Sequence, residues 1–438
     1  MAYDIEYGCR ALITLIVCRE TREKLTSKDF SSLPEKRQLE YINALIDVGW
    51  IKEQKNGKPD SDYVIYAFTD KGRKIFENPS ELLNMSDVEQ EHISLLRKLD
   101  SLRREDDVAT MPQTLIALAN SCIGLGRYDS ALMYAVDLQK KAEEMNSNYF
   151  KGEAAFLLGK AENARGEQET SLKYYVEAVE IFGKVGEISR EAESLRMAGG
   201  VLFKMGDYER SMMMFERSRE KFFETRNMMG VAKAKINLGI LCSIAKDYET
   251  AERYWLHALE FFEILEDKET VAKVLTNLGV MMVETEKYEG AIGYLRKSIL
   301  LCREIKNKYS ECVAALNFAY ANAMIKNFEV AREAAESIKD ALREGFDSYL
   351  LCYNDLILGI YNTARGPWAD AEKKFLSAIR FATTLGNPAL LAKCHEEYAK
   401  ALISRNENEK ALAEINASKS VLDAIPSKEL KKALSSGS

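Results

Sequence analysis

The sequence predicts a mainly α-helical protein, in which an α-solenoid of eight helix pairs follows a small α+β domain. The first observation is a series of small residues at a fixed interval of 40: Ala119, Gly159, Gly199, Gly239, Gly279, Ala319, Gly359 and Ala399. The second is a parallel series twelve residues further along: Ala131, Ser171, Ser211, Ala251, Ala291, Ala331, Ala371 and Ala411. A fixed period of this length is typical of stacked units that each contact mainly their neighbours. It favours binding along a surface over chemistry in a pocket.

The composition indicates a folded protein of the cytoplasm. The 438 residues are 47% hydrophobic and 29% charged, and no apolar run is long enough to cross a bilayer. No membrane partner is therefore expected. The eight cysteines include no CxxC pair, so we expect neither a disulfide framework nor a metal site. The net charge is −7, whereas residues 1–80 carry thirteen basic and thirteen acidic side chains. An acidic solenoid is poorly suited to non-specific nucleic-acid binding.

Each 40-residue unit is predicted to form two helices, because apolar residues recur at spacings of three and four. In four units we expect a left-handed glycine to end the first helix: Gly126, Gly166, Gly206 and Gly366. No proline occurs from 113 to 366, which favours nearly continuous helix. The small residues would let two helices approach closely. Large residues are predicted to fill the seam to the next repeat: Tyr175, Phe215, Trp255, Leu295 and Phe375.

The unit at Leu238-Gly239 continues with Tyr248, Ala251, Trp255 and Ala258, and similar units begin at Leu158-Gly159 and Leu358-Gly359. This motif resembles the tetratricopeptide repeat family, and the resemblance covers residues 112–431. It implies eight helix pairs in a right-handed superhelix. The usual period is 34, and the proline that commonly ends the second helix is missing here. Both departures imply second helices longer by about a turn and a half. Such 40-residue variants are similar to peptide-sensing regulators and cell-polarity adaptors of the family.

The family resemblance implies that the first helices line a concave groove for a protein or peptide. The residue before the Leu-Gly pair would face this groove, and three units have an amide there: Asn237, Asn277 and Asn317. Cations and aromatic residues are expected on the same face: Arg196, Lys204, Lys233, Lys273, Tyr320 and Tyr353. Amides suit the backbone of an extended peptide, and the cations favour an acidic segment or a C-terminal carboxylate. Alternatively, the amides only bond a neighbouring helix.

Residues 1–80 differ from the repeats. Helices are predicted at 6–20, from about 26 and at 34–48, strands at 50–54 and 63–68, and a last helix at 71–76. Three helices before a two-stranded wing resemble the winged helix-turn-helix domains of archaeal and bacterial regulators. The resemblance implies candidate DNA contacts: Lys36, Arg37, Gln38, Tyr41, Lys55 and Lys58. The balanced charge equally suits a domain that docks a protein or forms a homodimer.

Residues 81–111 are predicted to link the two parts. A capping-box pattern begins at Ser86, and Leu95, Leu96, Leu99 and Leu102 indicate an amphipathic helix that covers the first repeat. We expect a disordered tail at 432–438.

No catalytic constellation, phosphate-binding loop or metal-ligand spacing is present in the sequence, so we expect a protein without enzymatic activity or cofactor. One hypothesis is a transcription regulator, whose winged helix contacts double-stranded DNA while the solenoid senses a peptide or protein. The alternative is a scaffold or adaptor in which both parts bind protein and no DNA is bound. The sequence does not name the partner, the operator, the oligomeric state or the pathway.

Overall fold

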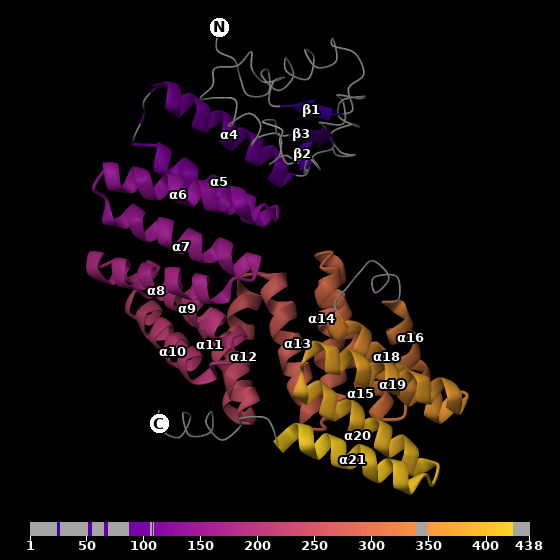
Figure 1. Cartoon of the computed structure of the whole chain (residues 1–438). Helices are drawn as coiled ribbons and strands as arrows, with labels where there is room; N and C mark the ends of the chain where they lie inside the picture. Colours follow the sequence, from indigo (N-terminus) through magenta and orange to yellow (C-terminus); the bar gives the residue numbers. More distant parts are fainter. Residues whose placement is uncertain are drawn as a thin grey trace. The chain divides into compact units, whose positions relative to one another are not determined.

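The computed structural model describes residues 24–26, 51–54, 65–68, 87–338 and 348–423, except 106 and 108. These residues are mainly α-helical (Figure 1). The chain divides into two compact units, Met1–Asp207 and Tyr208–Ser438, which are described separately. The described part of the chain contains no helix that is both long and apolar enough to cross a membrane.

Three short strands precede the helices. They are β1 (Lys24–Thr26), β2 (Ile51–Gln54) and β3 (Ile65–Phe68), and they form an antiparallel sheet of order β1-β3-β2. β2 and β3 fall on the two predicted strands, with Ile51 opposite Phe68. β1 was not expected from the sequence. The predicted helices of residues 1–80 and the predicted tail at 432–438 lie outside the described residues.

The first unit contains the linking helix and the first repeats. Its helices are α4 (Asp87–Glu105), α5 (Met111–Gly124), α6 (Tyr128–Glu144), α7 (Asn148–Arg165), α8 (Gln168–Val185) and α9 (Ile188–Lys204). α4 begins directly after Ser86, and its buried Leu96 and Leu99 share a hydrophobic core with Leu115 and Leu118 of α5. The helix predicted to cover the first repeat is therefore present and packs as expected.

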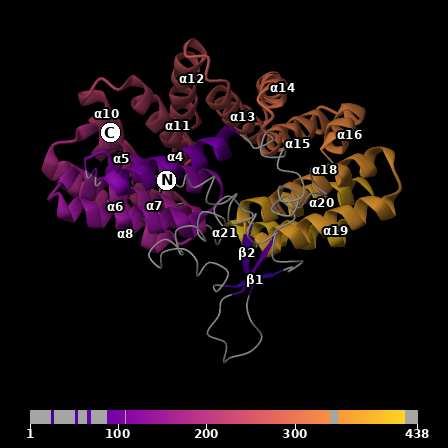
Figure 2. The same cartoon turned by 90° about the horizontal axis from the view of Figure 1, so that it is seen from above.

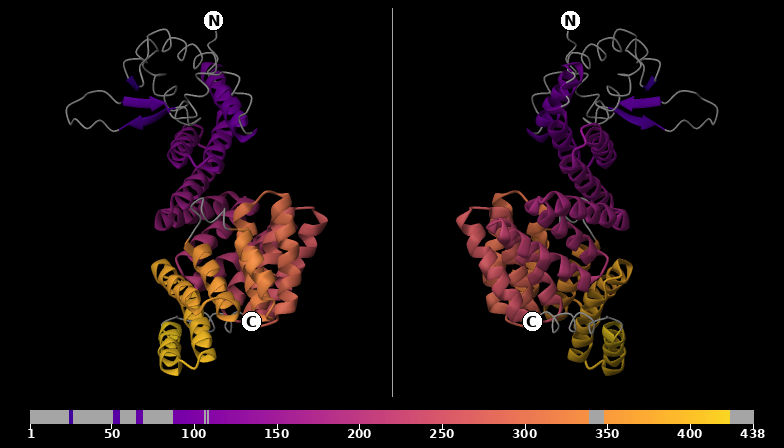
Figure 3. Two further views of the ribbon diagram at one scale, coloured as in Figure 1. Left: turned by 90° about the vertical axis from the view of Figure 1, so that its right-hand side faces the viewer. Right: turned by 90° about the vertical axis from the view of Figure 1, so that its left-hand side faces the viewer.

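The second unit contains the remaining helices. They are α10 (Tyr208–Glu224), α11 (Met228–Ile244), α12 (Tyr248–Ile264), α13 (Lys268–Glu284), α14 (Tyr288–Glu304), α15 (Lys308–Met324), α16 (Phe328–Ser337), α18 (Ser348–Arg365), α19 (Trp368–Leu385), α20 (Pro388–Ser404) and α21 (Asn408–Asp423). Within each unit, successive helices lie side by side (Figure 2 and Figure 3). Within the two units the helices form the predicted pairs α5–α6, α7–α8, α11–α12, α13–α14, α15–α16, α18–α19 and α20–α21, and the boundary between the units falls between α9 and α10.

A shorter rhythm of 20 residues underlies the 40-residue period. Most turns contain one residue with a positive φ, and these residues recur at intervals of 20 along much of the array: Gly126, Asn146, Gly166, Gly186, Gly206, Arg226, Lys246, Glu266, Glu286, Lys306, Lys326, Gly386 and Asn406. Each helix with its turn therefore occupies 20 residues. The prediction of lengthened second helices alone was wrong, because α11 and α12 both have 17 residues.

One of the four predicted left-handed glycines adopts a different conformation. Gly126, Gly166 and Gly206 have φ values of 73°, 92° and 80°, as expected, whereas Gly366 is outside the left-handed region. Gly366 is followed by Pro367, whose ring restricts the backbone of the preceding residue. The proline therefore explains why this turn departs from the others.

The small residues of the first helices face large residues of the second helices. A Cβ on Gly239 would lie 2.5 Å from Nε1 of Trp255, and a Cβ on Gly159 would lie 3.0 Å from the Tyr175 ring. The Trp255 indole also donates a hydrogen bond of 3.0 Å to the carbonyl of Ile236. These large residues therefore pack against the small residues of their own repeat, and they also belong to cores that include the next repeat, as Phe375 does by stacking on Tyr398 at 5.2 Å. Antiparallel helices joined by a short turn bring positions sixteen apart opposite each other.

Candidate functional site

The first helices of the second unit place one stripe of residues at the same positions in successive repeats. A spacing of four, three and four residues puts its members on one side of a helix. We call this stripe the inner face; it comprises Lys233, Asn237, Ile240 and Ile244 of α11, Lys273, Asn277, Val280 and Glu284 of α13, Val313, Asn317, Tyr320 and Met324 of α15, Tyr353, Ile357 and Ile360 of α18, and Lys393, Glu397 and Lys400 of α20.

The inner face is open to solvent on α11 and α13. Lys233 and Lys273 are exposed, and Asn237 and Asn277 are half-buried. Nδ2 of Asn277 is buried and has no hydrogen-bond partner within the described residues. A buried donor without a partner is unfavourable by about 1–3 kcal/mol. The amide of Asn277 therefore keeps a donor that no described residue satisfies.

Asn317 differs from the other two asparagines. Its side chain is only 3% exposed, and its Nδ2 donates a hydrogen bond of 2.9 Å to the carbonyl of Val313 in the same helix. The bond lies within α15, whereas the alternative interpretation expected a bond to a neighbouring helix. The open part of the amide series thus consists of Asn237 and Asn277.

Beyond α13, the inner face is filled by its own side chains. The hydroxyl of Tyr320 on α15 donates a hydrogen bond of 3.1 Å to Oε1 of Glu397 on α20. One whole repeat lies between the repeats of these two helices. Nζ of Lys393 on α20 donates a hydrogen bond of 2.8 Å to the hydroxyl of Tyr353 on α18. Tyr320, Tyr353 and Glu397 are all nearly inaccessible to solvent. These contacts cover the middle of the face over α15, α18 and α20, whereas Lys400 is exposed and Met324 is half-buried.

The covered part contains a cation in an unfavourable environment. Nζ of Lys393 lies 3.8 Å from the ring centroid of Tyr320, and burial lowers the pKa of Lys393 to about 8 even though Glu397 and Glu284 act against this shift. Burial, followed by the charge of Glu397, raises the pKa of the Tyr320 hydroxyl. The phenol therefore remains protonated at physiological pH and can keep donating to Glu397.

The structure does not unite all predicted site residues. Arg196 and Lys204 belong to the first unit, where Arg196 pairs with Glu193 at 2.5 Å and Lys204 donates to Oδ1 of Asn163 at 2.9 Å. The candidate DNA contacts lie outside the described residues: Lys36, Arg37, Gln38, Tyr41, Lys55 and Lys58. Their predicted roles stay predictions.

Sequence reasoning missed Lys393 and Glu284 as members of the inner face. The signal was present, because Lys393 lies 40 residues after Tyr353 and Glu284 lies seven residues after Asn277. Extending the asparagine position by one helical turn towards the N-terminus and by two turns towards the C-terminus would have found both.

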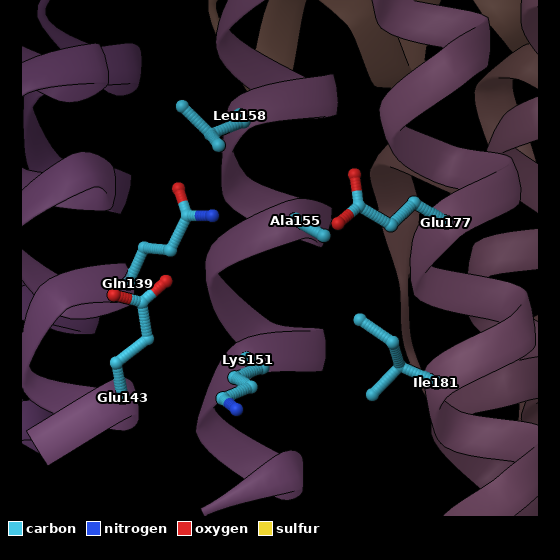
Figure 4. Close-up of a pocket in the computed structure, with 7 residues that line it drawn as sticks. All are labelled: Gln139, Glu143, Lys151, Ala155, Leu158, Glu177 and Ile181. Carbon is cyan, nitrogen blue, oxygen red and sulfur yellow. The ribbon is translucent and has the colours of Figure 1, made fainter. Parts of the chain in front are cut away.

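A shallow pocket in the first unit is a separate feature (Figure 4). It lies between α6, α7 and α8 and is lined by Gln139, Glu143, Lys151, Ala155, Leu158, Glu177 and Ile181. It contains none of the predicted site residues. Within the described ranges, no group of three or more histidine, cysteine, aspartate or glutamate residues could hold a metal ion.

Comparison with known families identifies the repeats. Residues 230–304, which include most of α11 and all of α12 to α14, match the family model of the tetratricopeptide repeat. This segment is similar to tetratricopeptide repeats. No curated protein matches the sequence.

Several solved structures share the fold of these tetratricopeptide repeats. The apo form of RapI is 16% identical with a TM-score of 0.60, and the match covers 82% of this chain and 99% of RapI. The apo quorum sensor NprR from B. thuringiensis is 15% identical with a TM-score of 0.52, and the match covers 77% of this chain and 100% of NprR. The Rap conjugation gene regulator of plasmid pLS20, in complex with the Phr* peptide, is 12% identical with a TM-score of 0.53. The match covers 78% of this chain and 97% of the regulator. At these identities the likeness shows the fold alone.

Proposed function

We propose that this chain is a non-enzymatic interaction protein that binds a peptide or protein segment on the inner face of α11 and α13. The observation that carries the proposal is the buried, unpartnered Nδ2 of Asn277 beside exposed Lys273. Asn237 and Lys233 repeat the same two residue types 40 residues earlier. A regulator of similar fold has been solved with a peptide, which supports the same class of ligand.

The chemistry of this surface favours an extended and partly acidic segment. An extended backbone offers carbonyl and N–H groups at regular intervals. An asparagine amide can donate to the carbonyl groups and accept from the N–H groups. Lys233 and Lys273 lie one helical turn before the two amides, so both would attract carboxylates of the ligand.

Replacement of both open amides tests the proposed binding face. Asn237→Ala/Asn277→Ala is expected to lower the capture of short random-sequence peptides at least about tenfold, the equivalent of about 1.4 kcal/mol. Circular dichroism should show unchanged helix content, because neither amide holds a helix in place. Asn317→Ala is the matched control and should retain capture, since Asn317 already bonds Val313. Wild-type capture by the double variant would contradict the proposal.

We also propose that residues 1–80 form a winged-helix domain that contacts double-stranded DNA, which would make the protein a regulator. β2 and β3 pair as an antiparallel hairpin at the position of the predicted wing, which supports the proposal. The alternative is a scaffold in which this domain binds protein.

A gel-shift titration with the full chain separates the two functions. For a DNA-binding regulator, the affinity should fall as salt rises, because each neutralised phosphate contributes about 0.9 to the slope of log K against log salt. Lys36→Ala/Arg37→Ala/Lys55→Ala/Lys58→Ala should flatten this slope. Absence of salt-sensitive binding by the wild type would instead favour the scaffold.

A further inference from the structure

The second unit has another surface on the side of α11 that is opposite the inner face. Lys235 of α11 lies two residues after Lys233 of the inner face, which places it about 200° further around the helix. α11 packs against both α10 and α12, so side chains of these three helices can meet there. The inner face and this surface therefore use different side chains of the same helix.

The pocket of the first unit shows which positions share such a surface. Gln139 of α6, Ala155 of α7 and Glu177 of α8 line it together (Figure 4). The same positions two periods later, 219, 235 and 257, belong to α10, α11 and α12. We call the surface around them the outer patch; it comprises Arg219 and Phe223 of α10, Met228 and Lys235 of α11, and Arg253, His257 and Ile264 of α12. Spacings of four and seven residues keep the members of each helix on one side. Leu256 lies about 100° from His257 around α12 and is outside the patch.

Three cations of the outer patch lie close together without enough anions to neutralise them. Burial lowers the pKa of Lys235, and the charges of Arg219 and Arg253 lower it further. Arg219 pairs with Glu216 at 2.7 Å, whereas none of the described residues forms a side-chain hydrogen bond or ion pair with Lys235 or Arg253. Like charges from three helices repel one another, so an anion that approaches the patch is attracted.

Large apolar side chains at one end of the outer patch are exposed. Phe223 follows Arg219 by about one helical turn and is 66% exposed, and Ile264 at the end of α12 is 76% exposed. Met228, the first residue of α11, is also exposed. Uncovered apolar side chains that lie together indicate contact with another protein.

The distribution of charge indicates what kind of anion this surface fits. α10, α11 and α12 together carry eight acidic and seven basic side chains, so the outer patch is a small basic area among carboxylates. A nucleic acid presents a continuous row of phosphates and needs a longer basic surface. A short run of carboxylates next to an apolar side chain matches both parts of the patch.

From these observations we propose that the outer patch binds an acidic segment of a partner protein. Carboxylates of the segment bind Arg219, Lys235 and Arg253, and an apolar side chain next to them covers Phe223. This interaction goes beyond the proposed function, because the inner face and the outer patch lie on opposite sides of α11. The chain can therefore hold a peptide ligand and a protein partner at the same time.

Binding of labelled peptide pools to the full-length protein tests the proposal. Each peptide is a C-terminal amide with aspartate or glutamate in its first half and leucine or phenylalanine in its second half. A comparison pool has lysine in place of the acidic residues. Fluorescence anisotropy is expected to show at least about tenfold tighter binding of the acidic pool by wild type. Lys235→Glu/Arg253→Glu should abolish this preference, and Phe223→Ser should weaken binding of the acidic pool about tenfold.

Two matched variants leave the outer patch unchanged. Lys297→Glu/Lys373→Glu reverses two exposed cations of α14 and α19. It has the same net charge as the doubly substituted patch variant and should keep the preference for the acidic pool. Asn237→Ala/Asn277→Ala alters only the inner face and should bind the acidic pool like wild type.

Several results would overturn the proposal. Equal binding of the two pools by wild type, or an unchanged preference in Lys235→Glu/Arg253→Glu, would show that the cations of the patch do not select carboxylates. Loss of binding in the inner-face variant would place the acidic pool on the inner face. A wild-type dimer that Phe223→Ser converts to a monomer would assign the patch to a second copy of this chain. Displacement of the acidic pool by double-stranded DNA would assign the cations to nucleic acid.

Discussion

Gly239→Ala is expected to lower the free energy of unfolding of the second unit by about 2 kcal/mol. The new methyl group would lie 2.5 Å from Nε1 of Trp255, well inside van der Waals contact. The indole cannot move away freely, because its N–H donates to the carbonyl of Ile236 and its ring is almost completely buried. Urea unfolding of the full chain, followed by circular dichroism, would measure the loss.

Gly293→Ala is the matched control for this substitution. Gly293 lies within α14, and a Cβ at this position would have no atom within 4 Å. The same change should therefore raise stability by about 0.5–1 kcal/mol, as alanine does in place of glycine in a helix. Equal effects at the two positions would contradict close packing as the reason for glycine at 239.

Arg190→Ala is expected to lower the free energy of unfolding of the first unit by about 3 kcal/mol. Nη2 of Arg190 donates a hydrogen bond of 2.6 Å to Oε2 of Glu153, and the side chain of Glu153 is only 6% exposed. The guanidinium also lies 4.4 Å from the Phe156 ring centroid and 5.4 Å from that of Phe182. Without the arginine, Glu153 would remain as an uncompensated buried carboxylate.

Two further variants establish the cause of that loss. Glu153→Gln in the Arg190→Ala background should recover part of the stability, because it removes the stranded charge. Arg332→Ala should cost much less stability than Arg190→Ala, since Arg332 makes exposed ion pairs with Glu329 and Glu336 and lies 5.6 Å from the ring centroid of Tyr361. No recovery in the double variant would indicate that contacts with the aromatic rings, rather than charge pairing, dominate at Arg190.

The helix pairs could be predicted because their packing imposes a chemical requirement on the sequence. Close approach of two helices demands a small residue at a fixed place, and Gly239 opposite Trp255 shows why. The 20-residue rhythm was less visible, because its left-handed turn positions contain residues such as Arg226, Lys246 and Glu266 as often as glycine. Nothing in the type of these residues indicates a positive φ.

The candidate site could be predicted only in part, for a geometric reason. The position of Asn237 and Asn277 follows from the period, so sequence alone places them on one stripe. The coverage of that stripe depends on how strongly the array of stacked repeats curves. This curvature decides whether Tyr320 can contact Glu397, which lies 77 residues later in the sequence. Curvature results from many small packing rotations, and no single residue indicates it. The position of Lys393 beside the rings of Tyr320 and Tyr353 became apparent only with the surrounding side chains in place.

Site-specific photo-crosslinking tests the central claim most directly. A benzophenone amino acid replaces Ile244 on the inner face in one variant and Leu256 on the second helix α12 in another. The two native side chains are 42% and 41% exposed, so both positions are equally accessible. Irradiation with a pool of random free-acid peptides is expected to crosslink peptide at 244 and not at 256. Equal crosslinking at both positions, or crosslinking at 256 alone, would contradict binding on the inner face.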